Sequence, residues 1–162
     1  MTPPDWKSLL SYDPYTGELT WLLSTNNRLK PGDKAGYVSS NGYRVFKFQR
    51  RLYLAHRIAW YLHHGMFPPN DTDHINGDRA DNRIVNLRLA TRAENQRNKR
   101  MSSRNQTGYK GVHWRTKNQK WTAIINDRGK NVFLGYFDDP KSAHAAYCDA
   151  AKRFHGEFAR LA

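Results

Sequence analysis

Residues 73–98 constrain the fold of this chain more than any other segment. A short, partly apolar stretch ends at Ile75, and a second short stretch surrounds Leu87. The loop between them is rich in Asn, Asp and Gly, which we interpret as turn formers. Thr91 is followed three residues later by Glu94, which is the spacing of a capping box, so a helix should begin directly after Thr91. The segment therefore predicts a strand, a loop, a second strand and a helix.

Four polar side chains on this predicted frame could together cleave a phosphodiester. The carboxylate of Asp73 is a hard oxygen ligand suited to Mg²⁺, and the neighbouring imidazole of His74 can take a proton from water at neutral pH. The side-chain carbonyl of Asn95, on the predicted helix, could add a second oxygen ligand. Asn86 could hold the imidazole or brace the loop. An Asp-His pair beside a turn is common by itself, so the complete set on one frame is what favours a metal-dependent site.

The charge of the chain indicates a polyanionic partner. Its 162 residues include 27 Lys and Arg against 14 Asp and Glu, which gives a formal net charge of +13. The basic residues are interleaved with aromatic and apolar ones in most parts of the chain, and this favours a folded surface that follows phosphates. A basic chain can also be ribosomal or bind a membrane surface, so composition favours nucleic acid without deciding it.

The single cysteine, Cys148, excludes an internal disulfide and a cysteine-rich zinc site. No stretch approaches the roughly 18 apolar residues of a membrane span, and the N-terminus does not resemble a signal peptide. We therefore expect a soluble, cytoplasmic protein that has no membrane contact and no structural zinc.

The chain should fold as an α+β protein with two modules. The expected parts are a strand-rich module over residues 1–98, a polar and basic linker over 99–108, and a second module over 109–162. In the first module, Asn41 and Gly42 predict a hairpin turn, and residues 54–64 predict a helix. In the second, three strands precede a helix that Asp139 should cap. This pattern predicts a three-stranded antiparallel sheet packed on one helix.

Seven residues of the central segment recur together in a known family: Asp73, His74, Asn86, Leu87, Arg88, Glu94 and Asn95. With the runs 53–57 and 73–78, they resemble the phage-type HNH homing endonucleases, in the variant that has Asn in place of the final His. The resemblance covers roughly residues 50–100. The paired cysteines of the zinc-stabilised members of that family are absent here.

This resemblance implies a ββα-metal nuclease module in which His74 is the general base and Asn86 is its brace. Asp73 and Asn95 would hold Mg²⁺, or another divalent metal such as Mn²⁺. Family likeness also makes Arg57 a candidate phosphate contact. His56, beside it, is at least as well explained by helix packing, and we leave it outside the catalytic set.

The second module carries another resemblance, which rests on the runs 109–115, 120–124, 134–137 and 143–156. These runs are similar to the DNA-binding domain of plant ethylene response factors, in which a three-stranded sheet lies in the major groove and a helix backs it. Carried over position by position, the candidate DNA contacts are Lys110, His113, Arg115, Lys120, Thr122, Asn126 and Asn131. The predicted helix and linker add Arg97, Lys99, Arg100 and Arg104. The family favours Arg where His113, Asn126 and Asn131 stand, so the DNA sequence that is read should differ.

These features predict a metal-dependent endonuclease that hydrolyses a phosphodiester of double-stranded DNA. We expect a site-selective nick that leaves 5′-phosphate and 3′-hydroxyl ends, made by a monomer with no protein partner. Two alternatives stay open. One is a non-catalytic, sequence-specific DNA-binding protein that uses the C-terminal sheet, and the other is an RNA-binding or ribosome-associated protein.

Overall fold

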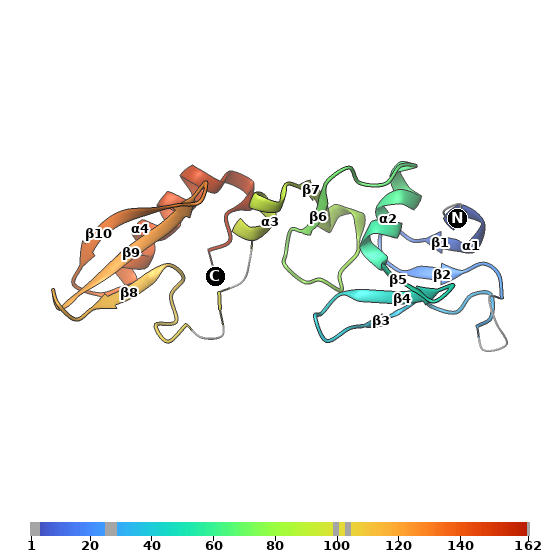
Figure 1. Ribbon diagram of the computed structural model, residues 1–162, viewed down its shortest axis with the longest axis horizontal. Helices are drawn as coiled ribbons and strands as arrows, with labels where there is room; N and C mark the ends of the chain where they lie inside the picture. The colour runs from blue at the N-terminus through green and yellow to red at the C-terminus, as the bar shows by residue number, and fades with distance from the viewer. Residues whose placement is uncertain (1–3, 25–28, 99–100, 103–104, 162) are drawn as a thin grey trace. The chain divides into compact units, whose positions relative to one another are not determined.

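The chain is a mixed α/β protein that divides into two compact units, Met1–Thr91 and Arg92–Ala162. The computed structural model describes residues 4–24, 29–98, 101–102 and 105–161. Figure 1 labels the helices and strands of both units along the chain. In the described part of the chain, no helix is long and apolar enough to span a membrane.

The first unit contains three small antiparallel sheets and one long helix. Its elements are α1 (Trp6–Leu9), β1 (Leu10–Tyr12), β2 (Leu19–Trp21), β3 (Tyr37–Val38), β4 (Arg44–Phe48), β5 (Arg51–Leu54), α2 (Ala55–His64), β6 (Asp71–His74), the 3-10 turn η1 (Ile84–Asn86) and β7 (Leu87–Ala90). In the first sheet β1 pairs with β2, in the second β4 lies between β3 and β5, and in the third β6 pairs with β7.

Local signals explain where the elements of this unit begin and end. The side chain of Asp5 accepts a hydrogen bond from the backbone N–H of Lys7 and so caps α1. The predicted hairpin turn at Gly42 lies between β3 and β4, with a backbone φ of 80° that a glycine adopts without strain. Gly65 ends α2 in the left-handed conformation, and its N–H donates a hydrogen bond to the carbonyl of Tyr61.

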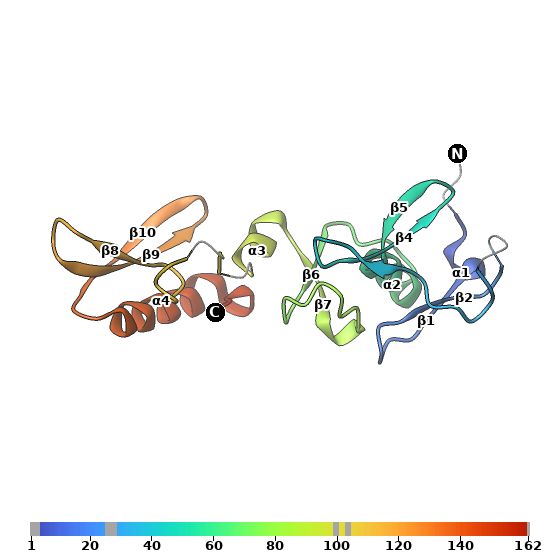
Figure 2. The ribbon, with the colours of Figure 1, turned by 90° about the horizontal axis from the view of Figure 1, so that it is seen from below.

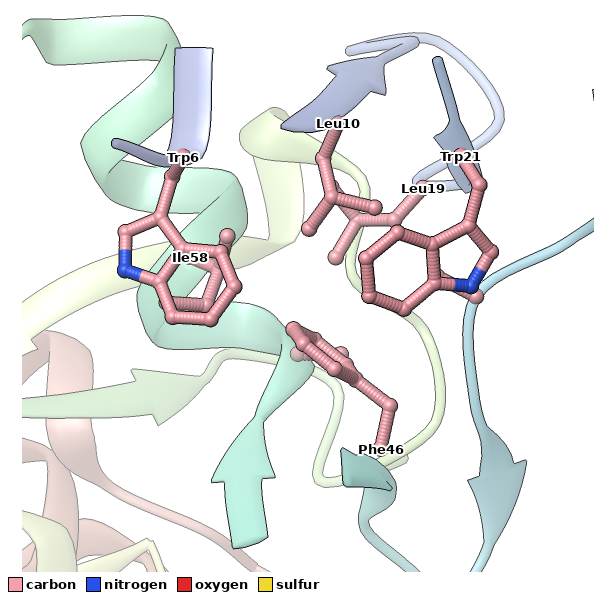
Figure 3. Packing of buried hydrophobic residues seen from close by; sticks show 8 residues of the cluster. Trp6, Leu10, Leu19, Trp21, Phe46 and Ile58 are labelled. Carbon is pink, nitrogen blue, oxygen red and sulfur yellow. The ribbon is translucent and has the colours of Figure 1, made fainter. Parts of the chain in front are cut away.

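Aromatic residues form most of the core of the first unit. Trp6 and Trp21 are almost fully buried, and the ring of Phe46 lies between them with both centroid distances at 5.7 Å (Figure 3). Ile58 of α2 and Leu10 of β1 close the same cluster. Edge-on aromatic pairs add about 0.5–1.5 kcal/mol each beyond the burial of their area. The core therefore joins residues 6–21 to β4 and α2, the helix that precedes β6.

The second unit is a three-stranded antiparallel sheet with one helix packed along a face. Its elements are α3 (Arg92–Arg97), β8 (Val112–Arg115), β9 (Lys120–Asp127), β10 (Lys130–Phe137), α4 (Pro140–His155) and the 3-10 turn η2 (Gly156–Phe158). β9 is the central strand (Figure 2). Asp139 caps α4 as predicted, because its carboxylate accepts from the N–H of Ser142. Ala123 and Ile125 of β9 pack against Ala143 and Tyr147 of α4.

The helix predicted after Thr91 begins at Arg92, and it is grouped with the second unit. The predicted modules differ from the two units in this respect, because they assigned residues 92–98 to the first. The linker over 99–108 stays a prediction, since four of its residues (99, 100, 103 and 104) lie outside the described part of the chain.

Candidate active site and nucleic-acid interface

The candidate site is built on the β6–β7 hairpin of the first unit. The register places Asp73 opposite Arg88 and His74 opposite Leu87. Residues that face each other across antiparallel strands have neighbouring side chains, and here they form an ion pair. Oδ2 of Asp73 accepts from Nε and Nη2 of Arg88 at 3.0 and 2.8 Å, and both side chains are largely buried. Arg88 belonged to the predicted motif, but the sequence assigned it no role. In the structure it binds the carboxylate of Asp73 and holds it in place.

His74 ends β6 inside the unit, where it is only 3% exposed. Its Nε2 lies 3.0 Å from Oδ1 of Asn82, which is also buried. Burial lowers the pKa of His74 below its ordinary value, and the hydrogen bond with Asn82 and nearby carboxylates oppose this only in part. The imidazole is therefore neutral at pH 7, which is the form that can accept a proton from water.

Asn86 braces the loop that follows His74, which is one of the two roles left open by the sequence. Its Oδ1 accepts from the N–H of Asn76 at 2.9 Å, and its Nδ2 donates to the carbonyl of Asp81 at 2.8 Å. The amide thus joins the beginning and the end of the loop. The brace on the imidazole that the family resemblance implied is corrected here, because the hydrogen-bonded amide beside His74 is that of Asn82.

His56 of α2 packs directly on His74, with ring centroids 5.0 Å apart and an edge-on arrangement. The ring of Tyr43 lies against both histidines, at 5.4 and 6.0 Å. His56 is 4% exposed, and burial, with smaller effects from His74 and Arg57, lowers its pKa to about 3. His56 is therefore an uncharged residue that packs against His74, in agreement with the packing role that the sequence suggested.

The donors predicted for a metal ion fit a hard cation in their chemistry. Asp73 offers a carboxylate beside His74, and Asn95, on α3 of the second unit, offers an amide oxygen. Among the described residues there is no group of three or more His, Cys, Asp or Glu side chains that could hold a metal ion.

Several basic candidates are engaged in contacts of their own. Arg57 donates to the carbonyls of Pro68 and Asn70 at 3.4 and 3.3 Å, and so it supports the turn before β6. Arg97 pairs with Asp127 at 3.4 Å within the second unit. Three further predicted contacts, Lys99, Arg100 and Arg104, lie outside the described residues.

The sheet of the second unit has an outer face, which we define as the face turned away from α4. The strand register assigns nine residues to it: His113, Arg115, Lys120, Thr122, Ile124, Asn126, Asn131, Phe133 and Tyr136. Phe133 and Tyr136 are about half exposed, and their rings contact each other edge-on at 5.0 Å. The face thus combines cations, amides and exposed aromatic rings, a combination suited to phosphates and bases. The two aromatic residues were not among the predicted contacts.

Two of the predicted contacts on this unit need comment. Thr122 is fully buried, and its hydroxyl donates to the carbonyl of His113. This corrects the prediction that Thr122 contacts DNA, because a side chain without exposed surface reaches neither phosphate nor base. Lys110 is half-buried, its pKa is lowered to about 8 by burial, and its Nζ donates to the carbonyl of Arg160 at 2.9 Å.

Two comparisons with known proteins bear on the segment that carries this site. Residues 53–97 match the HNH endonuclease family. That range includes Asp73, His74, Asn86 and Asn95. The chain is also 29% identical over 119 residues to Protein 3.8 of Escherichia phage T7, in an alignment that covers 73% of this chain and 94% of that protein. These likenesses support a phage-type HNH nuclease and a function as a DNA endonuclease.

Proposed function

We propose that this protein is a metal-dependent endonuclease of the homing type that nicks duplex DNA. The observation that carries the proposal is the neutral, hydrogen-bonded imidazole of His74 directly beside the carboxylate of Asp73, at the end of a strand inside the segment that matches HNH endonucleases. A base and a hard oxygen ligand at adjacent positions are two of the parts that phosphodiester hydrolysis requires.

In the proposed reaction His74 takes a proton from a water molecule as the water oxygen attacks the phosphorus atom. The bond from phosphorus to the 3′-oxygen breaks, and the 3′-oxygen leaves with the bonding electron pair and is protonated by solvent. The products are a 5′-phosphate and a 3′-hydroxyl. One such site per chain gives a nick, and a double-strand break would need a second chain or a second binding event.

Asp73 would hold the divalent cation, Mg²⁺ or Mn²⁺, and Asn95 is the second ligand that the resemblance to HNH endonucleases implies. When bound, the cation would supply stabilisation of the negative charge that develops on the phosphate and on the leaving oxygen. Arg88 keeps Oδ2 of Asp73 in a fixed position through two hydrogen bonds, which restricts the rotation of the carboxylate before any ligand arrives.

We further propose that the second unit binds the duplex through the outer face of its sheet. Support comes from the exposed side chains of His113 and Arg115, from the exposed rings of Phe133 and Tyr136, and from the net charge of +13. The main alternative is a DNA-binding protein without catalytic activity. Against it stands the buried arrangement around His74, which a mere scaffold would not need.

Nicking can be tested on a pool of supercoiled plasmids that carry random 30-base-pair inserts. With Mg²⁺ the protein should convert part of the pool to open circles, and EDTA should prevent this. DNA ligase should reseal the open circles directly, because it requires a 5′-phosphate beside a 3′-hydroxyl. Asp73→Asn, which removes the carboxylate charge, should need a much higher Mg²⁺ concentration. Duplex binding without any open circles would favour the non-catalytic alternative.

Binding by the outer face should appear in the salt dependence of DNA affinity. Each neutralised phosphate contributes about −0.9 to the slope of log K against log salt concentration. Arg115→Ala, which removes an exposed cation of the outer face, should make this slope shallower by about 1. Lys141→Ala removes the same charge from α4, on the other side of the sheet, and should leave the slope unchanged. Equal effects of the two variants would contradict the proposed face.

A further inference from the structure

We propose that Asn82 is a positioning residue that fixes the tautomer of His74 and thereby makes Nδ1 the nitrogen that accepts the proton. This inference rests on the proposed nuclease function for its consequence. The hydrogen bond on which it depends can be examined without cleavage.

The chemistry of the contact determines which ring nitrogen of His74 carries the proton. An amide oxygen only accepts hydrogen bonds, so Nε2 of His74, 3.0 Å from Oδ1 of Asn82, must be the donor. A neutral imidazole carries a single N–H, and its lone pair is then on Nδ1. Both residues are buried, at 3% and 1% exposure, so water competes little for this hydrogen bond.

The burial of Asn82 favours a functional reason for the amide. Its Nδ2 is buried and, among the described residues, has no hydrogen-bond partner. A buried polar group without a partner costs about 1–3 kcal/mol. An apolar residue would pack at this position without that cost. The hydrogen bond that Oδ1 accepts from His74 gives a reason why an amide stands here.

The first strands of the chain hold Asn82 in place. The hydroxyl of Tyr12, on β1, donates to the carbonyl of Asn82 at 2.8 Å. Ile84 donates its N–H to the carbonyl of Pro14 at 3.1 Å. Gly17, with φ of 76°, lies so close that a Cβ there would be 2.6 Å from the carbonyl carbon of Asn82 and 2.5 Å from the nitrogen of Arg83. The β1–β2 turn therefore fixes the backbone that carries Oδ1, which gives the N-terminal segment a part in the site.

The tautomer can be read from the ring nitrogens of His74 by ¹⁵N–¹H correlation NMR of the metal-free, full-length protein at pH 8.5. The native protein should carry its proton on Nε2. Asn82→Leu, which removes the acceptor, should give a mixture of tautomers. Asn82→Asp keeps an acceptor of the same shape. The neutral ring of His74 should therefore keep its single proton on Nε2 in this variant.

The rate at which supercoiled plasmid is nicked then shows whether the tautomer of His74 matters for catalysis. Asn82→Leu should reduce the rate by about 10–100-fold, as loss of an orienting partner commonly does, and Asn82→Asp should restore most of it. A proton on Nδ1 in the native protein would overturn the proposal, as would an Asn82→Leu ring that keeps Nε2–H. If Asn82→Leu does not fold, the native protein and Asn82→Asp still decide the tautomer. If no DNA is cut at all, the NMR result stands while the proposed nuclease function fails.

Discussion

His74→Ala should abolish nicking almost entirely while duplex binding persists. Loss of a general base lowers a rate by about 10²–10⁴-fold, and no other residue is assigned this role here. Because burial lowers the pKa of His74 below its ordinary value, the native rate should begin to fall only at a pH more acid than an ordinary imidazole would give. The measurement is the initial rate of open-circle formation, with binding followed separately by fluorescence anisotropy.

Two controls sharpen this result. His64→Ala removes an exposed imidazole at the end of α2 and should cut at the native rate. Added imidazole should restore part of the activity of His74→Ala, because the deleted side chain leaves space for a free base. A His74→Ala protein that nicks as fast as the native one would show that the base is another residue or that a contaminating nuclease acts.

Acid should destabilise the first unit strongly, and His56 should cause much of the loss. Folding lowers the pKa of His56 to about 3, chiefly by burial, so below pH 6.5 the unfolded chain binds a proton that the folded chain does not. The free energy of unfolding then falls by about 1.4 kcal/mol per pH unit as the pH decreases. The decrease ends near pH 3, where the folded state also binds the proton. Its total is about 4–5 kcal/mol.

This prediction is tested as a difference between variants. Urea unfolding of the first unit can be followed from pH 7 to pH 3 through the indole N–H signals of Trp6 and Trp21, which lie in its core. His56→Leu should reduce the steep loss, because leucine binds no proton, and the part that comes from the lowered pKa of His74 should remain. His63→Leu, which changes an exposed residue of the same helix, should keep the whole loss. An unchanged loss in His56→Leu would mean that His56 titrates equally in the folded and unfolded chain.

Elements whose signals are local were predictable from the sequence. Asp139 and the proline after it define the start of α4, and Gly65 defines the end of α2, because a cap depends on the residues within one turn. The turn at Gly42 has the same origin. Asp73 and His74 were likewise assigned to the end of a strand from their neighbours in the sequence, and β6 ends there.

Contacts between distant residues were not predictable in this way. The hydroxyl of Tyr12 reaches a carbonyl 70 residues further along the chain, and His56 meets His74 from a separate helix. From its polar neighbours in the sequence, Asn82 is interpreted as a turn former. No sequence pattern predicts that its amide contacts an imidazole. The resemblance to the plant DNA-binding domain made Thr122 a DNA contact. In the structure Thr122 is completely buried, and it lies opposite two larger residues on the flanking strands, His113 and Tyr136.

By itself, the sequence determined which residues could do the chemistry and on which kind of element each would stand. It did so because residue types, caps and turn residues act over a few neighbours. Only the tertiary structure decided how His74 is held: buried, neutral, bonded to Asn82 and walled by His56. These properties depend on the exclusion of water and on side chains brought together from β1, α2, β6 and the loop after it. No stretch of the chain carries them alone.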